Sequence, residues 1–460
     1  MTNPVSQLNE PQSTIDLTAL MNLEQNSESI KLSEDMKVKM VQWIKSEYQK
    51  MKAAKESNKR QWYTNLLMFY GNQYAEHYKR NNIPEVGVRR GPSWRVRQTV
   101  NLIRPLIRTE ISRLTSQKPT STAVPATTSD SDMFAAQAAE QTWEFIQQRV
   151  NFSHVQERVT FWSSITGTGF YKTWWDNDYV DPFVLGAIDQ APIKGNIRIK
   201  PATPFNIFVP DLLEEEIEDQ PFIFEAYTKN VTWVKRFWNI DVKPNVISQS
   251  EIIEASMLNM PSANDAKPDS VLVIEAWIKP GGSEIYPDGG MFTIVGDELV
   301  EASSLYSHAQ YPYTKQISIP TEKFYGDSVL VDVNNLQREF NRLRSQITES
   351  RNRMARPQLL APVGSIDPKK YTSQPGLIVM YKPGWGKPEP LPMQSLPPYV
   401  LEDQDRIRQA IEDISGQHQV TRGMAPGSGV TAATAISFLQ EQDDSLLGPA
   451  YRSIEQAMEK

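Results

Sequence analysis

One acidic run holds the chain's densest group of possible metal ligands. Residues 211–219 read DLLEEEIED, which places six carboxylates within nine positions. Carboxylate oxygens are the ligands that hard divalent cations prefer in proteins. Acidic runs are more often solvated loops, however, because like charges repel and favour water. A solvated loop is therefore the favoured interpretation, and we predict no metal site there.

Other patterns typical of catalysis are missing. The chain has four histidines, and none stands at a zinc-binding spacing from another: His77, His154, His308 and His418. The pair Gly386-Lys387 is followed by Pro388, so the phosphate-binding G-x-x-x-x-G-K-[ST] loop is absent. The GTG at 167–169 lacks the G-x-G-x-x-G frame and is typical of a turn before a strand. Since no nucleophile, base and orienting group occur together, we predict that the chain is not an enzyme and needs no cofactor.

Composition narrows the class of protein further. The chain has 460 residues, 39% of them hydrophobic, which is enough for a sizeable core in two or three structural units. Its net charge of −7 argues against tight binding of nucleic acid through bulk charge. The absence of cysteine excludes a disulfide scaffold and a thiolate metal site. We expect no signal peptide and no membrane span, because no basic start precedes an apolar run and no stretch of about 18 apolar residues occurs.

The secondary structure expected from the sequence consists of a folded body followed by a long helix. Residues 1–33 are polar and are expected to be disordered. Helical periodicity dominates from residue 34 onwards, and short β-branched and aromatic runs separated by Gly, Pro and Asp follow after residue 170. The expected fold class is therefore α+β, with residues 34–320 forming a helical part and then a strand-rich part.

The segment 325–356 is predicted to form one long helix ended by Pro357. Its apolar residues recur every 3.5 positions on average, which is the spacing of a narrow packing seam. The seam consists of Val329, Val333, Leu336, Phe340, Leu343 and Ile347. Opposite the seam, at 100° per residue, lie Arg338, Arg342, Glu349, Arg353 and Arg356. A helix of this kind needs neighbours along its whole length, because one narrow stripe cannot hold it folded in water.

The residues after this helix suggest that the chain runs out to a tip and returns. Residues 357–400 are dense in proline and glycine, which predicts a small, stiff protrusion. Residues 401–416 return as a helix with Leu401, Ile407, Ile411 and Ile414 as its seam and Gly416 at its end. Residues 417–429 are expected to be a flexible loop, and another helix is expected from residue 430, interrupted near Gly448-Pro449.

Three arrangements of the long helix stay open at this point. It could be one arm of a coiled-coil dimer, a surface helix of a bundle, or one of many copies standing side by side in a ring. Composition and periodicity do not choose among them.

Several passages together resemble the portal (head-to-tail connector) family of tailed bacteriophages over roughly residues 36–460. They are Phe69-Tyr70-Gly71 at the end of an early helix, VNLIRPLIRTEISRLTSQKPTSTAVPAT (100–127), GTGFYKTWWD (167–176), TPFNIFVPD (203–211), FYGDSVLVDVNNLQREFNRLRSQI (324–347) and GVTAATAISFLQEQDDSLLGP (429–449). No single passage is specific, and the resemblance depends on their order and spacing.

The resemblance implies a ring, usually of twelve subunits, at one capsid vertex, through which double-stranded DNA is packaged and ejected. In such a ring the apolar seam of the long helix would pack between neighbouring subunits. Residues 34–320 would form the wing, 321–356 and 401–416 the two stem helices, and 357–400 a small α/β clip. Residues 417–429 would be the tunnel loop that lines the channel, and 430–460 the helix that returns towards wing and crown. We expect the crown to be missing, because the sequence stops in a helical pattern.

The resemblance also implies partners and contact residues. The partners would be the terminase large subunit, which supplies the packaging energy, head-tail adaptor or tail proteins, and the major capsid or scaffolding protein. The location would be the virion, and the host cytoplasm during assembly. Candidate DNA-channel residues are Arg338, Arg342, Arg353, Arg356, His418 and Arg422. Candidate docking residues for terminase or adaptor, in the clip, are Lys369, Lys370, Lys382, Trp385 and Lys387.

Two competing interpretations come from other classes of protein. One is a nucleic-acid-processing enzyme whose active site consists of scattered carboxylates, and the other is a structural coiled-coil dimer. ATPase and nuclease assays test the first, and the native mass tests the second.

Overall fold

The computed structural model describes most of the chain and confirms a mixed α+β fold. The described residues are 30–80, 83–87, 95–116, 122–180, 194–244, 270–306, 308–355, 358–367, 380–381, 384, 388–391, 397–417 and 445–460. Within these ranges, none of the helices combines the length and the apolar character that a membrane crossing requires.

Two consecutive helices begin the described chain. Helix α2 (Glu34–Ala54) is capped by Ser33, whose side chain accepts a hydrogen bond from the amide of Met36. Helix α3 (Glu56–Tyr70) ends at Gly71, which adopts a left-handed conformation with φ 89°. A hairpin of β1 (Glu76–Arg80) and β2 (Ile83–Gly87) follows.

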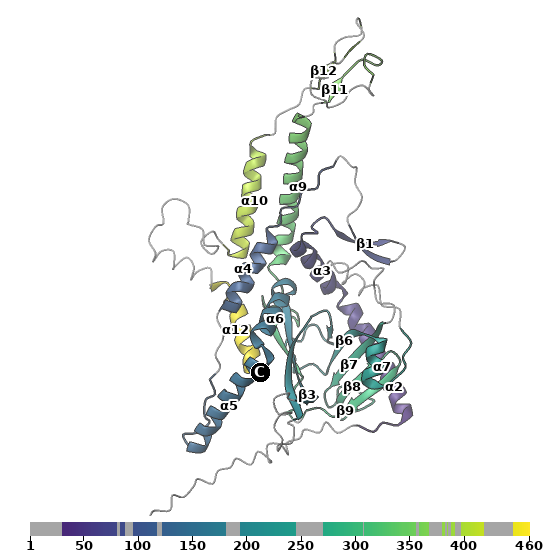
Figure 1. Ribbon diagram of the computed structural model, residues 1–460, viewed down its shortest axis with the longest axis vertical. Helices are drawn as coiled ribbons and strands as arrows, with labels where there is room; N and C mark the ends of the chain where they lie inside the picture. The colour runs from purple at the N-terminus through teal and green to yellow at the C-terminus, as the bar shows by residue number, and fades with distance from the viewer. Residues whose placement is uncertain are drawn as a thin grey trace, which may run out of the picture.

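An antiparallel five-stranded sheet forms the side of the body seen at the right of Figure 1. Its strand order is β5-β6-β7-β8-β9, and the strands are β5 (Ile207–Phe208), β6 (Phe222–Asn230), β7 (Ser270–Ile278), β8 (Gly290–Val295) and β9 (Glu298–Ser303). Apolar residues of α2 such as Met40 and Ile44 pack on one face against Phe224 and Ile274. Helix α7 (Val231–Trp238) covers part of the other face through Val234.

A second, three-stranded sheet has the order β10-β3-β4. It consists of β10 (Tyr313–Ile317), β3 (Thr168–Val180) and β4 (Lys194–Ala202), and helices α5 (Asp130–Val150) and α6 (Phe152–Thr166) precede it in the chain. The turn into β3 requires Gly167, which has φ 90° and would carry a Cβ only 2.0 Å from the carbonyl oxygen of Gly326. The GTG passage is therefore a turn before a strand, as the sequence predicted.

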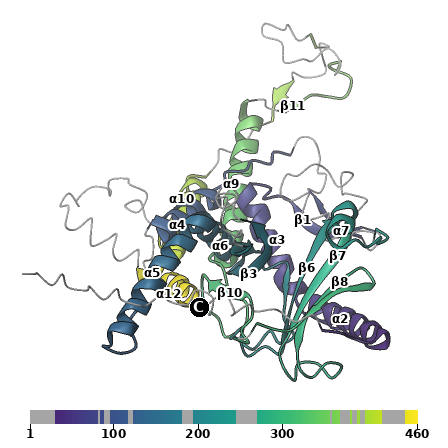
Figure 2. The ribbon, with the colours of Figure 1, turned by 60° about the horizontal axis from the view of Figure 1, so that its bottom comes forward.

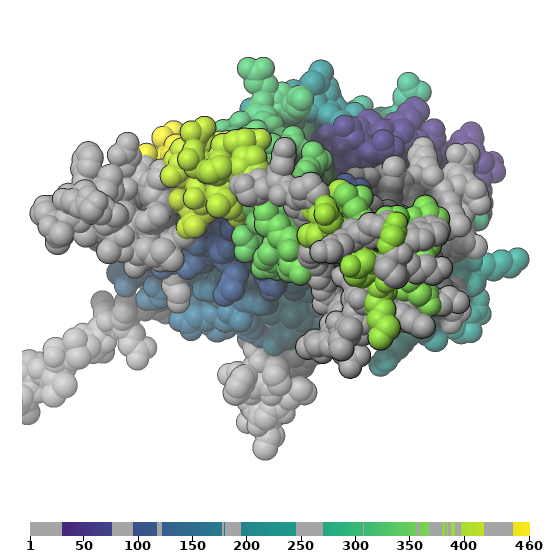
Figure 3. Space-filling model, turned by 90° about the horizontal axis from the view of Figure 1, so that it is seen from above, coloured from purple at the N-terminus to yellow at the C-terminus, as the bar shows by residue number. Residues whose placement is uncertain are grey.

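A pair of antiparallel helices rises from this body. Helices α9 (Leu330–Ala355) and α10 (Tyr399–Ser415) run side by side, and the short pair β11 (Leu359–Leu360) and β12 (Glu389–Pro390) lies beyond their far end (Figures 1 and 2). Viewed from above, the two helices occupy neighbouring parts of the surface (Figure 3). Helices α4 (Ile103–Ser116) and α12 (Gly448–Glu459) lie at the base of the pair and pack through Leu114, Ala450 and Ile454.

The long helix differs from the sequence prediction in two ways. It begins at Leu330 instead of residue 325, and Ser328 accepts a hydrogen bond from the Leu330 amide at 3.2 Å. Its apolar seam, including Val333 and Phe340, joins the same hydrophobic cluster as Ile407 and Ile411 of α10. The seam is thus used within one chain, whereas the sequence-based hypothesis assigned it to contacts between subunits.

The seam predicted for α10 is half correct. Ile407 and Ile411 are buried, but Leu401 and Ile414, towards the two ends of the helix, are 54% and 46% exposed. Helix α10 ends at Gly416, with φ 61°, as predicted. Residues 430–444, where the next helix was expected to start, lie outside the described residues, and the helix that is described starts at Gly448.

Candidate nucleic-acid interface

Helix α9 carries a second repeat, made of polar residues. Gln337, Asn341, Ser345 and Glu349 recur at every fourth position, so they lie along one face of the helix. Gln337, Asn341 and Ser345 are buried, which is unusual for such side chains unless they are hydrogen-bonded. Their partners lie in an extended segment far away in the sequence.

That extended segment is 96–102, and it runs antiparallel to α9. Backbone amides of alternate residues donate to successive side chains of the helix: Val96 to Glu349 Oε1 at 2.9 Å, Gln98 to Ser345 Oγ at 3.0 Å, Val100 to Asn341 Oδ1 at 2.9 Å and Leu102 to Gln337 Oε1 at 3.0 Å. We call these four bonds the ladder. Gln337 also donates to the carbonyl oxygen of Val100 at 2.8 Å.

The ladder works because two different backbone repeats advance by similar distances. Four helical residues rise about 6.0 Å, and two extended residues span about 6.6 Å. Every second amide of the extended segment therefore meets the next side chain along the helix. The polar side chains of α9 take the place of a neighbouring strand for a segment that would otherwise bury unpaired amides.

The ladder positions two arginines beside two others. Arg95 and Arg97 flank Val96 on the extended segment, and with Arg338 and Arg342 of α9 they line a cavity of about 380 Å³. All four side chains are exposed to solvent. We call this cavity the arginine pocket.

The electrostatics of the arginine pocket favour an anion. Among the described residues, none of the four guanidinium groups forms an ion pair with a carboxylate. Glu349, which also lines the cavity, is held by the Val96 amide. Guanidinium groups bind phosphate oxygens through paired N–H donors, so four of them can hold a phosphate backbone.

The structure brings together only part of the predicted DNA-channel set. Arg338 and Arg342 share the arginine pocket, whereas Arg353 lines an adjoining cavity of about 290 Å³. Gln346 and Glu349 line both cavities. Glu349 lines the arginine pocket beside Arg338 and Arg342, as its predicted position on the helix implied, and its carboxylate also belongs to the ladder because it accepts a backbone N–H bond. The other predicted channel and docking residues lie outside the described residues: Arg356, His418, Arg422, Lys369, Lys370, Lys382, Trp385 and Lys387.

Sequence reasoning missed Arg95 and Arg97. The signal was present in the passage RVRQ, where two arginines alternate with other residues as they would on one side of an extended chain. The four-residue repeat of Gln337, Asn341, Ser345 and Glu349 was the matching signal in the helix.

The carboxylates of the acidic run 211–219 do not converge on one point, because several of them contact different partners. Glu218 pairs with Lys279 at 2.7 Å and Glu216 with Lys460 at 3.3 Å, while Asp211 accepts a bond from the Leu213 amide at 2.8 Å. Across the described part of the chain, no three acidic or histidine side chains are grouped as metal binding requires.

Comparisons with known proteins give no information about the function of this chain. No family model matches the chain, and no curated protein matches it.

Proposed function

We propose that the protein is a portal subunit, which assembles into a ring at one capsid vertex and forms the channel for double-stranded DNA. The observation that carries this proposal is the helix pair α9 and α10, which stands out from the body with a small β-unit beyond its end (Figure 1). Such a rod suits a subunit that lines a bore together with many copies of itself. The order of sequence passages that resemble the portal family supports the same function.

The surface of the helix pair supports contacts with further copies. Met354 of α9 and Leu401 and Ile414 of α10 are 45%, 54% and 46% exposed in the single chain. These side chains are spread along the projecting helix pair, with Leu401 and Ile414 towards opposite ends of α10, so a partner that covers them would contact the pair along its length. In a ring, neighbouring helix pairs would cover them.

The arginine pocket gives the channel a point of contact with DNA. The chain as a whole carries a net charge of −7, so most of the surface would repel a phosphate backbone. A few guanidinium groups on such a surface would hold the duplex briefly without adding strong, salt-dependent affinity. Terminase, adaptor and scaffolding or capsid proteins are the partners that this proposal requires, with the tip beyond the helix pair as the docking surface for terminase and adaptor.

A structural coiled-coil dimer is less well supported. A dimer would need the apolar seam of α9 for a second chain, but Val333 and Phe340 are already buried in a hydrophobic cluster of the same chain that also contains Ile407 and Ile411 of α10. The contact between chains would then depend on other residues.

Negative-stain electron microscopy of the purified chain, combined with native mass, tests the proposal. We expect rings with a central hole and a mass of many subunits at micromolar concentration or after addition of scaffolding protein. Single molecules or twofold particles under both conditions would rule the portal function out. Turnover of ATP or cleavage of DNA by the pure chain would instead favour the nucleic-acid-processing enzyme.

A further inference from the structure

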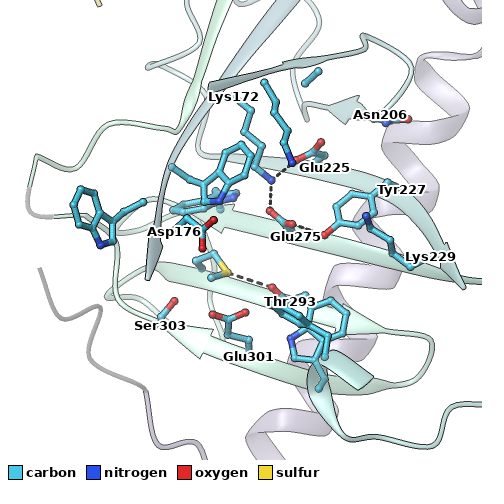
Figure 4. Close-up of a pocket in the computed structure, with 18 of the residues that line it drawn as sticks. Lys172, Asp176, Asn206, Glu225, Tyr227, Lys229, Glu275, Thr293, Glu301 and Ser303 are labelled. Atoms are coloured by element: carbon cyan, nitrogen blue, oxygen red, sulfur yellow. Dashed lines mark hydrogen bonds and ion pairs between the residues drawn. The ribbon is translucent and has the colours of Figure 1, made fainter. Parts of the chain in front are cut away.

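A cavity of about 580 Å³ lies where the two sheets of the body face each other (Figure 4). Strands β3 and β4 form one wall, strands β6 to β9 form the other, and α7 closes one end. The cavity is far in sequence from the arginine pocket, and no residue lines both. The proposed function does not use it.

Three glutamates cross the floor of this cavity in one row. Strand register places Glu225 of β6 opposite Glu275 of β7, Glu275 opposite Thr293 of β8, and Thr293 opposite Glu301 of β9. Like charges on directly opposite strands destabilise a sheet. A row of this kind therefore requires cations to balance it.

The other sheet supplies one such cation at one end of the row. Lys172 of β3 donates to Glu225 and to Glu275, at 2.6 Å in each case. Burial by itself lowers the pKa of Lys172, but the charges of the two glutamates outweigh burial and raise it. Tyr313 also donates to Glu225 at 2.9 Å and Tyr227 to Glu275 at 2.5 Å, so each glutamate at this end of the row accepts two hydrogen bonds.

Glu301, at the other end of the row, has no such partner. Among the described residues, no side chain donates a hydrogen bond to it or forms an ion pair with it. Partial burial and the charge of Glu275 raise the pKa of Glu301. Its side chain lines the cavity and is open to solvent, so a solute can reach it.

Aromatic rings form much of the remaining wall. Trp277 and Tyr306 stack with their ring centres 5.6 Å apart and line the same cavity as Glu301. Ring faces attract cations through their quadrupole, most strongly where water is partly excluded. A carboxylate beside aromatic rings is the usual chemistry of sites that recognise organic ammonium or guanidinium groups.

The lysines at the rim do not fill this role. Lys200 lies over the ring of Trp174 at 5.0 Å, and Lys229 lies over Trp233 at 4.7 Å. Both contact rings of β3 and α7, and neither forms an ion pair with Glu301. They do show that rings of this cavity bind cations.

We propose that the cavity binds an organic cation, an ammonium or guanidinium group, between the Glu301 carboxylate and the aromatic wall. The cation would balance the end of the glutamate row that Lys172 does not reach. A bare divalent metal ion fits poorly, because Glu301 and Glu275 are separated by a whole strand and rings offer no oxygen ligands. The cation can belong to a free polyamine or to a lysine or arginine side chain of a protein.

Titration of the full-length protein with small probes tests this site. Tryptophan fluorescence and calorimetry, in 150 mM salt, would follow spermidine, a blocked Gly-Arg-Gly peptide and a blocked Gly-Lys-Gly peptide. We expect saturable binding of at least one probe, weakened about tenfold or more by Glu301→Gln, because a hydrogen bond to a charged group is lost. Glu298→Gln, on the same strand but outside the cavity, is the matched control and should leave binding unchanged.

Comparison of spermidine with the two peptides also shows which kind of molecule carries the bound cation. Tighter binding of spermidine points to a free polyamine, and tighter binding of a peptide points to a protein side chain. If Glu301→Gln does not fold, Tyr306→Leu provides a second variant and should weaken binding roughly two- to fivefold. The proposal is overturned if no probe saturates at 5 mM, if both glutamate variants bind alike, or if a blocked glutamate peptide binds in place of the cations.

Discussion

At the scale of single residues, Glu110 is the clearest case of a carboxyl group out of its ordinary range. It lies on α4, is 4% exposed, and accepts a bond from Ser318 Oγ at 3.5 Å. Burial raises the pKa of Glu110 from 4.5 to about 7, and the nearby hydroxyl groups of Ser164 and Ser318 offset only part of that effect. The folded chain therefore binds a proton here that the unfolded chain releases between pH 4.5 and 7.

This difference predicts a pH-dependent stability. Because the pKa of Glu110 is higher in the folded state, the free energy of unfolding falls as pH rises from 4.5 to 7, by about 3 kcal/mol for this group. Glu110→Gln keeps the shape but removes the titration. We expect it to raise stability at pH 8 and to change little at pH 4.5, as measured by urea unfolding at both values. An equal effect of the substitution at both pH values would contradict the prediction.

Lys172 predicts a second residue-scale effect. Replacing it by methionine leaves Glu225 and Glu275 opposite each other without their shared cation. Removing one partner of a buried ion pair costs about 3–5 kcal/mol, so Lys172→Met should lower the unfolding free energy by about that much. Adding Glu225→Gln and Glu275→Gln to the same chain should restore most of the loss. A double-mutant cycle that shows no coupling would mean that the lysine acts only through packing.

At the scale of elements, the ladder fixes the position of α9 relative to the extended segment 96–102. Asn341→Leu would leave the amide of Val100 without its acceptor and would remove the bond that Asn341 donates to Gln73. Each buried polar group left unpaired costs about 1–3 kcal/mol, so we expect a loss of about 2–4 kcal/mol. Hydrogen exchange of the Val100 amide should also become faster, because the loss of its acceptor makes opening of this segment more favourable. Gln346→Leu, on the exposed side of the same helix, is the control and should change neither quantity.

The arginine pocket predicts how the assembled protein responds to salt. Arg338→Ala with Arg342→Ala should weaken binding of short duplex DNA and flatten the dependence of log K on log salt, because each lost phosphate contact removes about 0.9 from that slope. Arg158→Ala with Arg236→Ala removes the same charge outside the pocket and should leave the slope nearly unchanged. If both double variants gave the same slope of log K against log salt, the arginine pocket would not be a DNA contact of the proposed channel.

Element ends were predictable, whereas the site was predictable only in part. Ser33, Gly71 and Gly416 mark ends of α2, α3 and α10 through local chemistry that a sequence displays directly. Arg338 and Arg342 were found because helical periodicity places them on one face. The other half of the arginine pocket depends on pairing between residues 235 or more positions apart, and no local pattern specifies such pairing. The apolar seam was found too, but its partner was wrong for the same reason.

At the scale of the whole molecule, α5 differs from the other described helices of 15 residues or more in having no buried residue. Its 21 residues include none that is buried, and Phe134 and Phe145 are 70% and 58% exposed. The two rings lie on one side of the helix, eleven residues or about three turns apart. In the proposed ring, these two rings and the exposed residues of the helix pair would contact neighbouring copies.

This surface predicts a separation of assembly from folding. Phe134→Glu with Phe145→Glu should convert rings into single chains without changing the melting temperature of the chain, because exposed substitutions alter stability little. Native mass and thermal melting measure the two outcomes. Gln137→Glu with Gln148→Glu adds the same charge to exposed positions of α5 and should leave the rings intact. Rings that persist in the phenylalanine variant would place the subunit contact elsewhere.

The ladder also sets an order of events on the ribosome. Its two sides are 235 to 253 residues apart, so residues 96–102 are synthesised long before Gln337 to Glu349 exist. At about 5–20 residues per second, the wait lasts roughly 12–50 seconds. During that time the amides of Val96 and Val100 can be satisfied only by water or by a chaperone. The amino-terminal helices therefore cannot reach their final packing until the second half of the chain has emerged, and a ribosome that stalls before residue 337 would release a body with an open edge.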